Sequence, residues 1–134
     1  MKKLLMVLFL ALTVCACNEK SVDIRGNQYE LLNAPVNASI TLSFSDTDNR
    51  YFGKAVNNYF GTYEIKGNKL ILSAPASTMM MGPEDLMQAE MEYFQDLHKT
   101  DSFQATKNEL VIQLTDGKKL TFKQKKTETI QFND

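Results

Sequence analysis

From Gln28 onward, apolar and polar residues alternate in short runs that turn-forming residues separate. Such alternation is typical of half-buried β-strands. Gly67-Asn68 and Asp116-Gly117 are strong hairpin signals between neighbouring runs. Because strands joined by such short turns can only be antiparallel neighbours, the pattern predicts an antiparallel meander. The predicted strands span residues 29–32, 39–45, 50–56, 61–65, 69–73, 102–106, 109–115 and 118–125.

A different period appears between residues 78 and 97. Over 83–98 the apolar positions recur at about 100° per residue, which predicts one amphipathic helix. Its apolar side comprises Leu86, Met87, Ala89, Met91, Tyr93, Phe94 and Leu97, and its polar side comprises Glu84, Asp85, Gln88, Glu92, Gln95 and Asp96. The predicted fold class is α+β and mostly β, an antiparallel meander or barrel-like sheet packed on one helix at about 83–98.

Glu90 interrupts the apolar side of this helix, between Leu97 and Phe94. A carboxylate there must find hydrogen-bond partners or stay protonated, because a buried unpaired charge costs several kcal/mol. We expect Glu90 to fasten the helix to the sheet by accepting hydrogen bonds from Asn57, Thr78 or exposed backbone amides. The alternative is a role in ligand binding or in acid–base chemistry.

The N-terminal segment has the pattern of an export signal. Lys2 and Lys3 precede an apolar run over residues 4–14, which is too short to span a bilayer. The following Val14-Cys15-Ala16-Cys17 resembles the bacterial lipoprotein signal, in which the lipidated cysteine follows a small residue. We therefore predict a lipoprotein signal peptide at 1–16 and a lipid, with acyl chains such as palmitate, on Cys17. An ordinary cleaved secretory signal is the alternative.

After the signal peptide, the sequence predicts a lipidated cysteine and polar tether at 17–27, a domain at 28–126 and a C-terminal tail at 127–134. At roughly 3.3 Å per residue, the tether would hold the domain about 30 Å from the lipid surface. No later segment is apolar enough to cross a membrane, so the lipid would be the sole anchor. Asn18 is not a retention signal of the enterobacterial inner membrane, which favours the outer membrane of the cell envelope.

Composition and charge argue against several classes of function. The 134 residues suffice for one small domain. Removal of Lys2 and Lys3 leaves 13 basic against 16 acidic residues, which argues against nucleic-acid binding. With His98 as the sole histidine and no thiol after Cys17, we predict no catalytic residues, no metal site, no cofactor and no enzyme activity. The run 46–49 lacks the glycine and closing glutamate of a calcium loop, and it is predicted to be a hairpin turn.

Methionines and aromatic residues form two further clusters. Met79, Met80 and Met81 precede the helix, and thioethers can pack in a core, line a promiscuous apolar groove or bind Cu(I). Because His98 lies at the far end of the helix, core packing is the preferred interpretation. Tyr51, Phe52, Tyr59, Phe60 and Tyr63 crowd the central hairpin, where alternation predicts that Phe60 differs in exposure from Tyr59 and Tyr63. The lysines of the last strand are predicted to protect a sheet edge.

Several segments resemble one known family. The run Ala55-Val56-Asn57-Asn58-Tyr59-Phe60-Gly61-Thr62-Tyr63 resembles the Gly-Cys-Asn-x-aromatic-x-Gly-x-Tyr signature of META-domain (HslJ-like) proteins. Residues 78–83 resemble the family's Thr-x-Met-Ala-Cys segment, residues 90–97 match its Glu-x-x-x-Phe-x-x-Leu helix, and 108–122 match its closing hairpin. The resemblance extends over about 29–125. Val56 and Gly82 stand where relatives often have cysteines, so a bridge formed by those cysteines in relatives is absent here.

The resemblance implies a barrel-like sheet wrapped on one helix, often in an envelope lipoprotein, and it implies no catalytic reaction. With the leader, it predicts a monomeric, lipid-anchored envelope protein that acts as a non-enzymatic binding or assembly module, and the heat-shock relatives suggest a stress-related role. The expected partners are the membrane, through Cys17, and an envelope protein or small apolar ligand. The first alternative is a carrier with an apolar pocket at Met79, Met80, Met81 and Phe94. The second is a hydrolase that uses Glu90.

Overall fold

A computed structural model describes residues 22–126 of the chain. The predicted signal peptide, the lipidation site Cys17 and the predicted tail at 127–134 lie outside the described residues. Within the described range, no helix is both long enough and apolar enough to cross a bilayer. The elements are β1 (Gln28–Leu31), the 3₁₀ helix η1 (Pro35–Asn37), β2 (Thr41–Phe44), β3 (Arg50–Lys54), β4 (Asn58–Lys66), β5 (Lys69–Leu72), β6 (Ala76–Ser77), α1 (Glu84–Leu97), β7 (Thr100–Ala105), β8 (Glu109–Leu114) and β9 (Lys119–Lys125).

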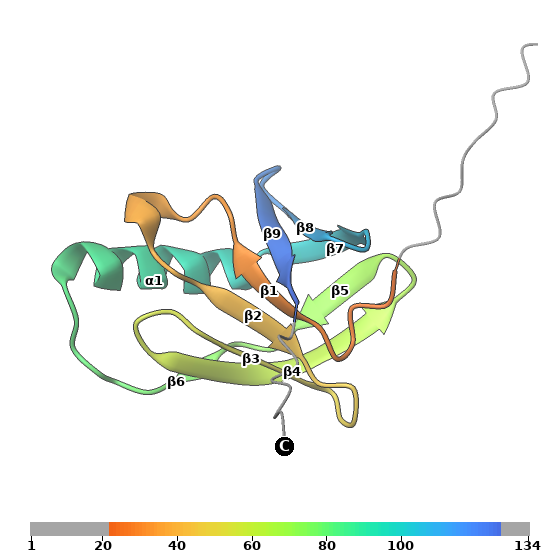
Figure 1. The fold of residues 1–134 in the computed structure, drawn as a ribbon, viewed down its shortest axis with the longest axis horizontal. Helices are drawn as coiled ribbons and strands as arrows, with labels where there is room; N and C mark the ends of the chain where they lie inside the picture. Colours follow the sequence, from red (N-terminus) through yellow and green to blue (C-terminus); the bar gives the residue numbers. More distant parts are fainter. Residues whose placement is uncertain (1–21, 127–134) are drawn as a thin grey trace, which may run out of the picture.

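Eight strands form a closed antiparallel barrel, which confirms the predicted fold class (Figure 1). Each strand pairs with the next one along the chain, and β7 continues the meander beside β5 after the chain has passed through α1. The barrel closes where β1 pairs with β9. The short strand β6, which the sequence did not predict, lies against β4 through the Tyr59–Ser77 and Phe60–Ala76 pairs.

Closure of the barrel overturns the edge role predicted for the lysines of the last strand. Lys119, Lys123 and Lys125 belong to β9, which is hydrogen-bonded to β1 on one side and to β8 on the other, whereas Lys118 lies in the β8–β9 turn. A strand with two neighbours exposes no backbone edge, so its lysines cover the outer surface of the barrel instead.

The described part of the predicted tether belongs to the domain. The backbone N–H of Val22 donates to the carbonyl of Ala105 at 3.2 Å, and that of Gly26 donates to Phe44 at 2.8 Å. Between them, the Ile24 side chain is completely buried in the core. The prediction of a tether up to residue 27 is therefore wrong for residues 22–27, because two apolar residues, Val22 and Ile24, are too short a run to give a clear period.

Tyrosine and phenylalanine rings fill much of the barrel interior. Tyr29, Phe44, Tyr51, Tyr59 and Phe122 are among the largest fully buried side chains. Two glycines make room for this packing. A Cβ atom at Gly53 would lie 2.0 Å from the Thr41 carbonyl oxygen, and one at Gly61 would lie 2.5 Å from the ring of Tyr51. Only a residue without a side chain allows such close approach.

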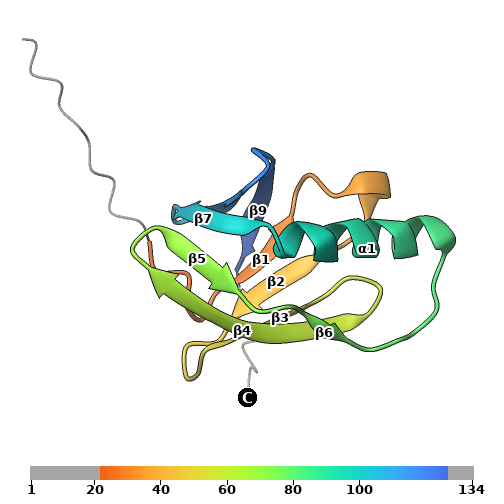
Figure 2. The same cartoon turned by 180° about the vertical axis from the view of Figure 1, so that it is seen from behind.

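The helix α1 closes one end of the barrel. Three connections lie at this end: η1 between β1 and β2, the β3–β4 turn, and the β8–β9 turn (Figures 1 and 2). α1 contacts η1 and is hydrogen-bonded to both turns. The β2–β3, β4–β5 and β7–β8 turns lie at the opposite end, where Val22 enters the described structure beside Ala105.

Candidate functional site

The predicted trio of Glu90, Asn57 and Thr78 forms one polar cluster between α1 and the β3–β4 turn. Glu90 is only 6% exposed. Its Oε2 accepts the backbone N–H of Asn57 at 2.6 Å, and its Oε1 accepts the Asn57 side-chain Nδ2 at 2.8 Å. A carboxylate with a partner on each oxygen avoids the cost of a bare buried charge. We call this arrangement the Glu90 clasp.

Asn57 also joins the clasp to the segment that leads into the helix. Its Oδ1 accepts the Thr78 hydroxyl at 3.0 Å and the backbone N–H of Met80 at 2.5 Å. The Thr78 hydroxyl oxygen in turn accepts the backbone N–H of Asn58 at 3.2 Å. Thr78 therefore reaches Glu90 through Asn57 and not by the direct bond that was one of the predicted alternatives. The side chain of Asn57 connects the β3–β4 turn, the 78–80 segment and α1.

Two tyrosine hydroxyls form a second helix–barrel contact. The Tyr59 hydroxyl lies 2.5 Å from the Thr41 carbonyl and 2.8 Å from the Tyr93 hydroxyl. Because a carbonyl can only accept, Tyr59 donates to Thr41 and thereby accepts from Tyr93. Burial raises the pKa of Tyr93, and burial with the neighbouring Tyr93 raises the pKa of Tyr59 well above its usual value. Both hydroxyls are therefore protonated at neutral pH.

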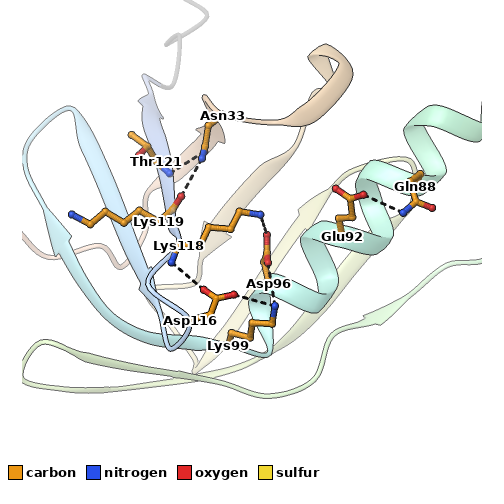
Figure 3. A network of polar contacts seen from close by, with 9 residues as sticks. All are labelled: Asn33, Gln88, Glu92, Asp96, Lys99, Asp116, Lys118, Lys119 and Thr121. Atoms are coloured by element: carbon orange, nitrogen blue, oxygen red, sulfur yellow. Dashed lines mark hydrogen bonds and ion pairs between the residues drawn. The ribbon is translucent and has the colours of Figure 1, made fainter.

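A second buried carboxylate, Asp96, lies near the C-terminal end of α1 (Figure 3). It is 6% exposed and forms an ion pair with Lys118 of the β8–β9 turn, with Lys99 at 4.0 Å on its other oxygen. Lys99 also contacts Asp116 at 3.2 Å. The backbone N–H of Lys118, followed by the Lys99 side chain, holds the pKa of Asp116 below its usual value. This Asp96 clasp was missed because Asp96 falls on the polar side of the helix.

The methionines line a groove on the outer side of α1 rather than the core. The groove has a volume of about 550 Å³, and Met79, Met80, Met81, Met87, Met91 and Phe94 contribute to its walls. Met79 is 95% exposed and Met81 is 90% exposed, so the prediction that this run packs in the core is wrong. Tyrosine and leucine side chains already fill the barrel, which leaves the 78–83 segment outside. The groove coincides with the apolar pocket predicted as an alternative.

An aromatic pair lies on the outer surface of β3 and β4. Phe52 and Phe60 are directly opposite each other in the ladder, and they are 49% and 57% exposed. Tyr59 and Tyr63 point into the barrel, which confirms the predicted difference from Phe60. Phe52 was not assigned to either surface from the sequence. The same alternation nevertheless predicts that Phe52 and its neighbour Tyr51 point to opposite faces of β3. The run 46–49 forms the β2–β3 turn, as predicted.

The comparisons with known proteins give a family from one family model and a fold from solved structures. A family model described as META domain matches residues 20–127. Among solved structures, the chain is similar to a protein from Burkholderia xenovorans studied by NMR, with a TM-score of 0.67 and 23% identity over 78% of this chain and 85% of that one. A second NMR structure has a TM-score of 0.57 and 18% identity, covering 75% of this chain and 90% of that chain.

A crystal structure of a duf4847 family protein from Bacteroides vulgatus ATCC 8482 has a TM-score of 0.50 and 16% identity, covering 66% of this chain and 61% of that chain. At these identities the similarity of the three structures shows the fold alone. No curated protein gives a significant sequence match.

Proposed function

The chain belongs to the META-domain family, and on this basis we propose that it is a non-enzymatic binding module of the bacterial cell envelope, anchored through a lipid on Cys17. One observation carries the proposal: the barrel interior is filled with buried side chains, whereas an aromatic pair is left exposed outside. A filled barrel favours recognition on its outer surface over enclosure of a ligand.

The exposed pair Phe52 and Phe60 is the surface that we assign to a protein partner. Aromatic side chains are enriched at the centres of protein interfaces, where burying each ring is strongly favourable. The two rings extend from adjacent strands of the barrel, so they are presented on a rigid surface. Binding would therefore cost little conformational entropy of the backbone.

The Glu90 clasp supports the non-enzymatic part of the proposal. Both carboxylate oxygens accept N–H groups of Asn57, and the side chain is nearly buried. A general acid or base must reach its substrate within hydrogen-bonding distance, which would require this pair of bonds to open. The geometry thus favours a fastening role for Glu90 over the hydrolase alternative.

The position of Val22 would set the orientation of a domain anchored through Cys17. Val22 lies at the barrel end opposite α1, and the five residue steps from Cys17 to Val22 can span at most about 18 Å. A lipid on Cys17 would therefore hold the β7–β8 end close to the membrane and direct α1 away from it. Cys17→Ser should release the protein from sedimented membranes, and continued sedimentation would contradict the anchor.

Site-specific photocrosslinking in envelope-containing cells tests the partner surface. A photoreactive residue in place of Phe60 should give a discrete crosslinked product, and the same residue at Glu64, further along the outward side of β4, should not. Phe52→Ser should weaken the Phe60 product by removing half of the aromatic surface. Equal yields from positions 60 and 64 would contradict this assignment.

The methionine groove favours a second candidate, a carrier of a small apolar ligand. Its volume of about 550 Å³ lies within the usual range for small-molecule sites. Native mass spectrometry of protein purified without refolding should then show a co-purifying apolar species. A clean mass for the ligand-free protein would leave the protein-binding proposal as the sole candidate.

A further inference from the structure

We propose that the methionine groove is a binding site for a soft monovalent metal ion, Cu(I) or its analogue Ag(I). The five methionines that follow residue 21 in the sequence all line this groove, and so does the single histidine, His98. The buried core, in contrast, consists of leucine, isoleucine, alanine, tyrosine and phenylalanine. Methionine is thus concentrated where sulfur can meet solvent, which apolar packing does not require.

The Glu90 clasp holds residues 79–81, the methionine loop, against α1. The backbone N–H of Met80 donates to Asn57 Oδ1, and Asn57 Nδ2 donates to Glu90, the neighbour of Met91 in α1. Met87 of the helix also approaches the loop. Its sulfur lies 3.8 Å from the position that a Cβ atom on Gly82 would occupy, and Gly82 directly follows Met81 in the chain. Thioethers from the loop and from the helix therefore line one groove.

The donor set matches a soft cation. Uncharged thioethers select Cu(I), and imidazole is a common additional ligand for copper. His98 follows Met91 by seven residues, about two helical turns, and both line the groove. His98 lies about 10 Å along the helix axis from Met91, so the proposed ligands are the thioethers, and His98 borders the same groove.

Charge and competing sites agree with this assignment. The Glu84 carboxylate also lines the groove and favours a cation there. Among residues 22–126, no group of three or more His, Cys, Asp and Glu side chains could hold a harder metal. The site uses neither Phe52 nor Phe60, so it is independent of the proposed partner surface.

Methionine-methyl NMR of the full chain tests the site. The chain is labelled with ¹³C at the methionine methyl groups and studied in detergent, with Cys15→Ser and Cys17→Ser so that no thiol competes. On addition of one equivalent of Ag(I), the methyl signals of groove methionines should shift, whereas those of Met1 and Met6 should not. Shifts in the groove that are no larger than those of Met1 and Met6 would overturn the proposal.

A leucine variant distinguishes metal binding by the groove from binding of apolar molecules alone. Met80→Leu/Met81→Leu/Met87→Leu keeps the groove apolar and the Met80 backbone bond intact, but it removes three sulfurs. We expect its affinity for Ag(I) to fall by roughly tenfold or more, while its far-UV spectrum and its binding of an apolar dye are unchanged. Unchanged Ag(I) affinity in this folded variant would refute thioether ligation.

Discussion

Two carboxylates in one helix, Glu90 and Asp96, fasten α1 to the same end of the barrel by opposite means. Each is 6% exposed. Glu90 accepts only uncharged N–H groups, both from Asn57, which is itself buried. Asp96 is paired with the ammonium groups of Lys118 and Lys99, whose side chains are about half exposed.

The difference lies in what is left behind when a carboxylate is lost. Without Glu90, the two N–H donors of Asn57 lose their acceptor at a position where Asn57 is only 2% exposed. Without Asp96, the two lysines can turn toward solvent and regain their hydration. Similar burial of two acids therefore does not imply similar contributions to stability.

Loss of Glu90 should have the largest effect. Glu90→Ala is expected to lower the free energy of unfolding by more than about 2 kcal/mol, because it leaves two donors unpaired and opens a cavity. Chemical denaturation monitored by far-UV circular dichroism measures this. Glu90→Gln keeps the volume and one acceptor and should cost less. A curve for Glu90→Ala that coincides with wild type would refute the fastening role.

Loss of Asp96 should have a smaller effect. Asp96→Ala is expected to cost about 1 kcal/mol, since the partners that it leaves are already half solvated. The same denaturation assay, run beside Glu90→Ala, gives the ranking. If Asp96→Ala proved as destabilising as Glu90→Ala, the exposure of the partner would not govern the cost of losing a buried carboxylate.

The tyrosine contact should reveal itself at alkaline pH. Burial raises the pKa of Tyr59 and Tyr93, and it raises the pKa of Tyr51 to about 12. Above about pH 10 the unfolded chain ionises these groups and the folded chain does not, so stability should fall as pH rises from about 10 towards 12.

Tyr93→Phe isolates the helix side of this contact. At pH 7 it should cost about 0.5 to 1 kcal/mol, the loss of one hydrogen bond. Above pH 10 its stability should fall less steeply than that of wild type, because one fewer proton is released on unfolding. Denaturation midpoints between pH 7 and 11 measure both effects. An identical alkaline slope in the two proteins would contradict the assignment of Tyr93.

Added salt should produce the smallest change in stability, and it should affect the Asp96 clasp but not the Glu90 clasp. Raising the ionic strength to about 1 M shortens the screening length to about 3 Å, which weakens the partly exposed Lys118–Asp96 pair by a few tenths of a kcal/mol. The difference in stability between wild type and Asp96→Ala should therefore shrink with added NaCl. The difference between wild type and Glu90→Ala should not change. If the stability losses of Asp96→Ala and Glu90→Ala depended equally on NaCl, the two clasps would not differ in the electrostatic way proposed here.

The sequence was sufficient for those features that a local period encodes. Alternation located the eight barrel strands, and the 100° period located α1 within one residue at each end. Glu90 was identified because it breaks that period, and a buried acid demands donors, which led to Asn57. The need of Glu90 for hydrogen-bond donors was thus predictable from its own helix, and Asn57 was one of the donors proposed for it.

Features set by distant segments were not predictable. Asp96 occupies a polar helix position, and its partner Lys118 comes from the β8–β9 turn, 22 residues further along the chain. The methionine run is apolar, but whether the core has space for it depends on the summed volume of all the rings. Neither packing volume nor the closure between β1 and β9 has a local signature.

A double-mutant cycle between Glu90→Ala and Asn57→Ala, with Asp96→Ala and Lys118→Ala as the matched second cycle, tests the central comparison most directly. We expect a coupling energy above about 1.5 kcal/mol for the buried pair and below about 1 kcal/mol for the half-exposed pair. Additive effects of Glu90→Ala and Asn57→Ala, or the reverse order of the two couplings, would contradict the role of Glu90 as the principal fastener of the helix.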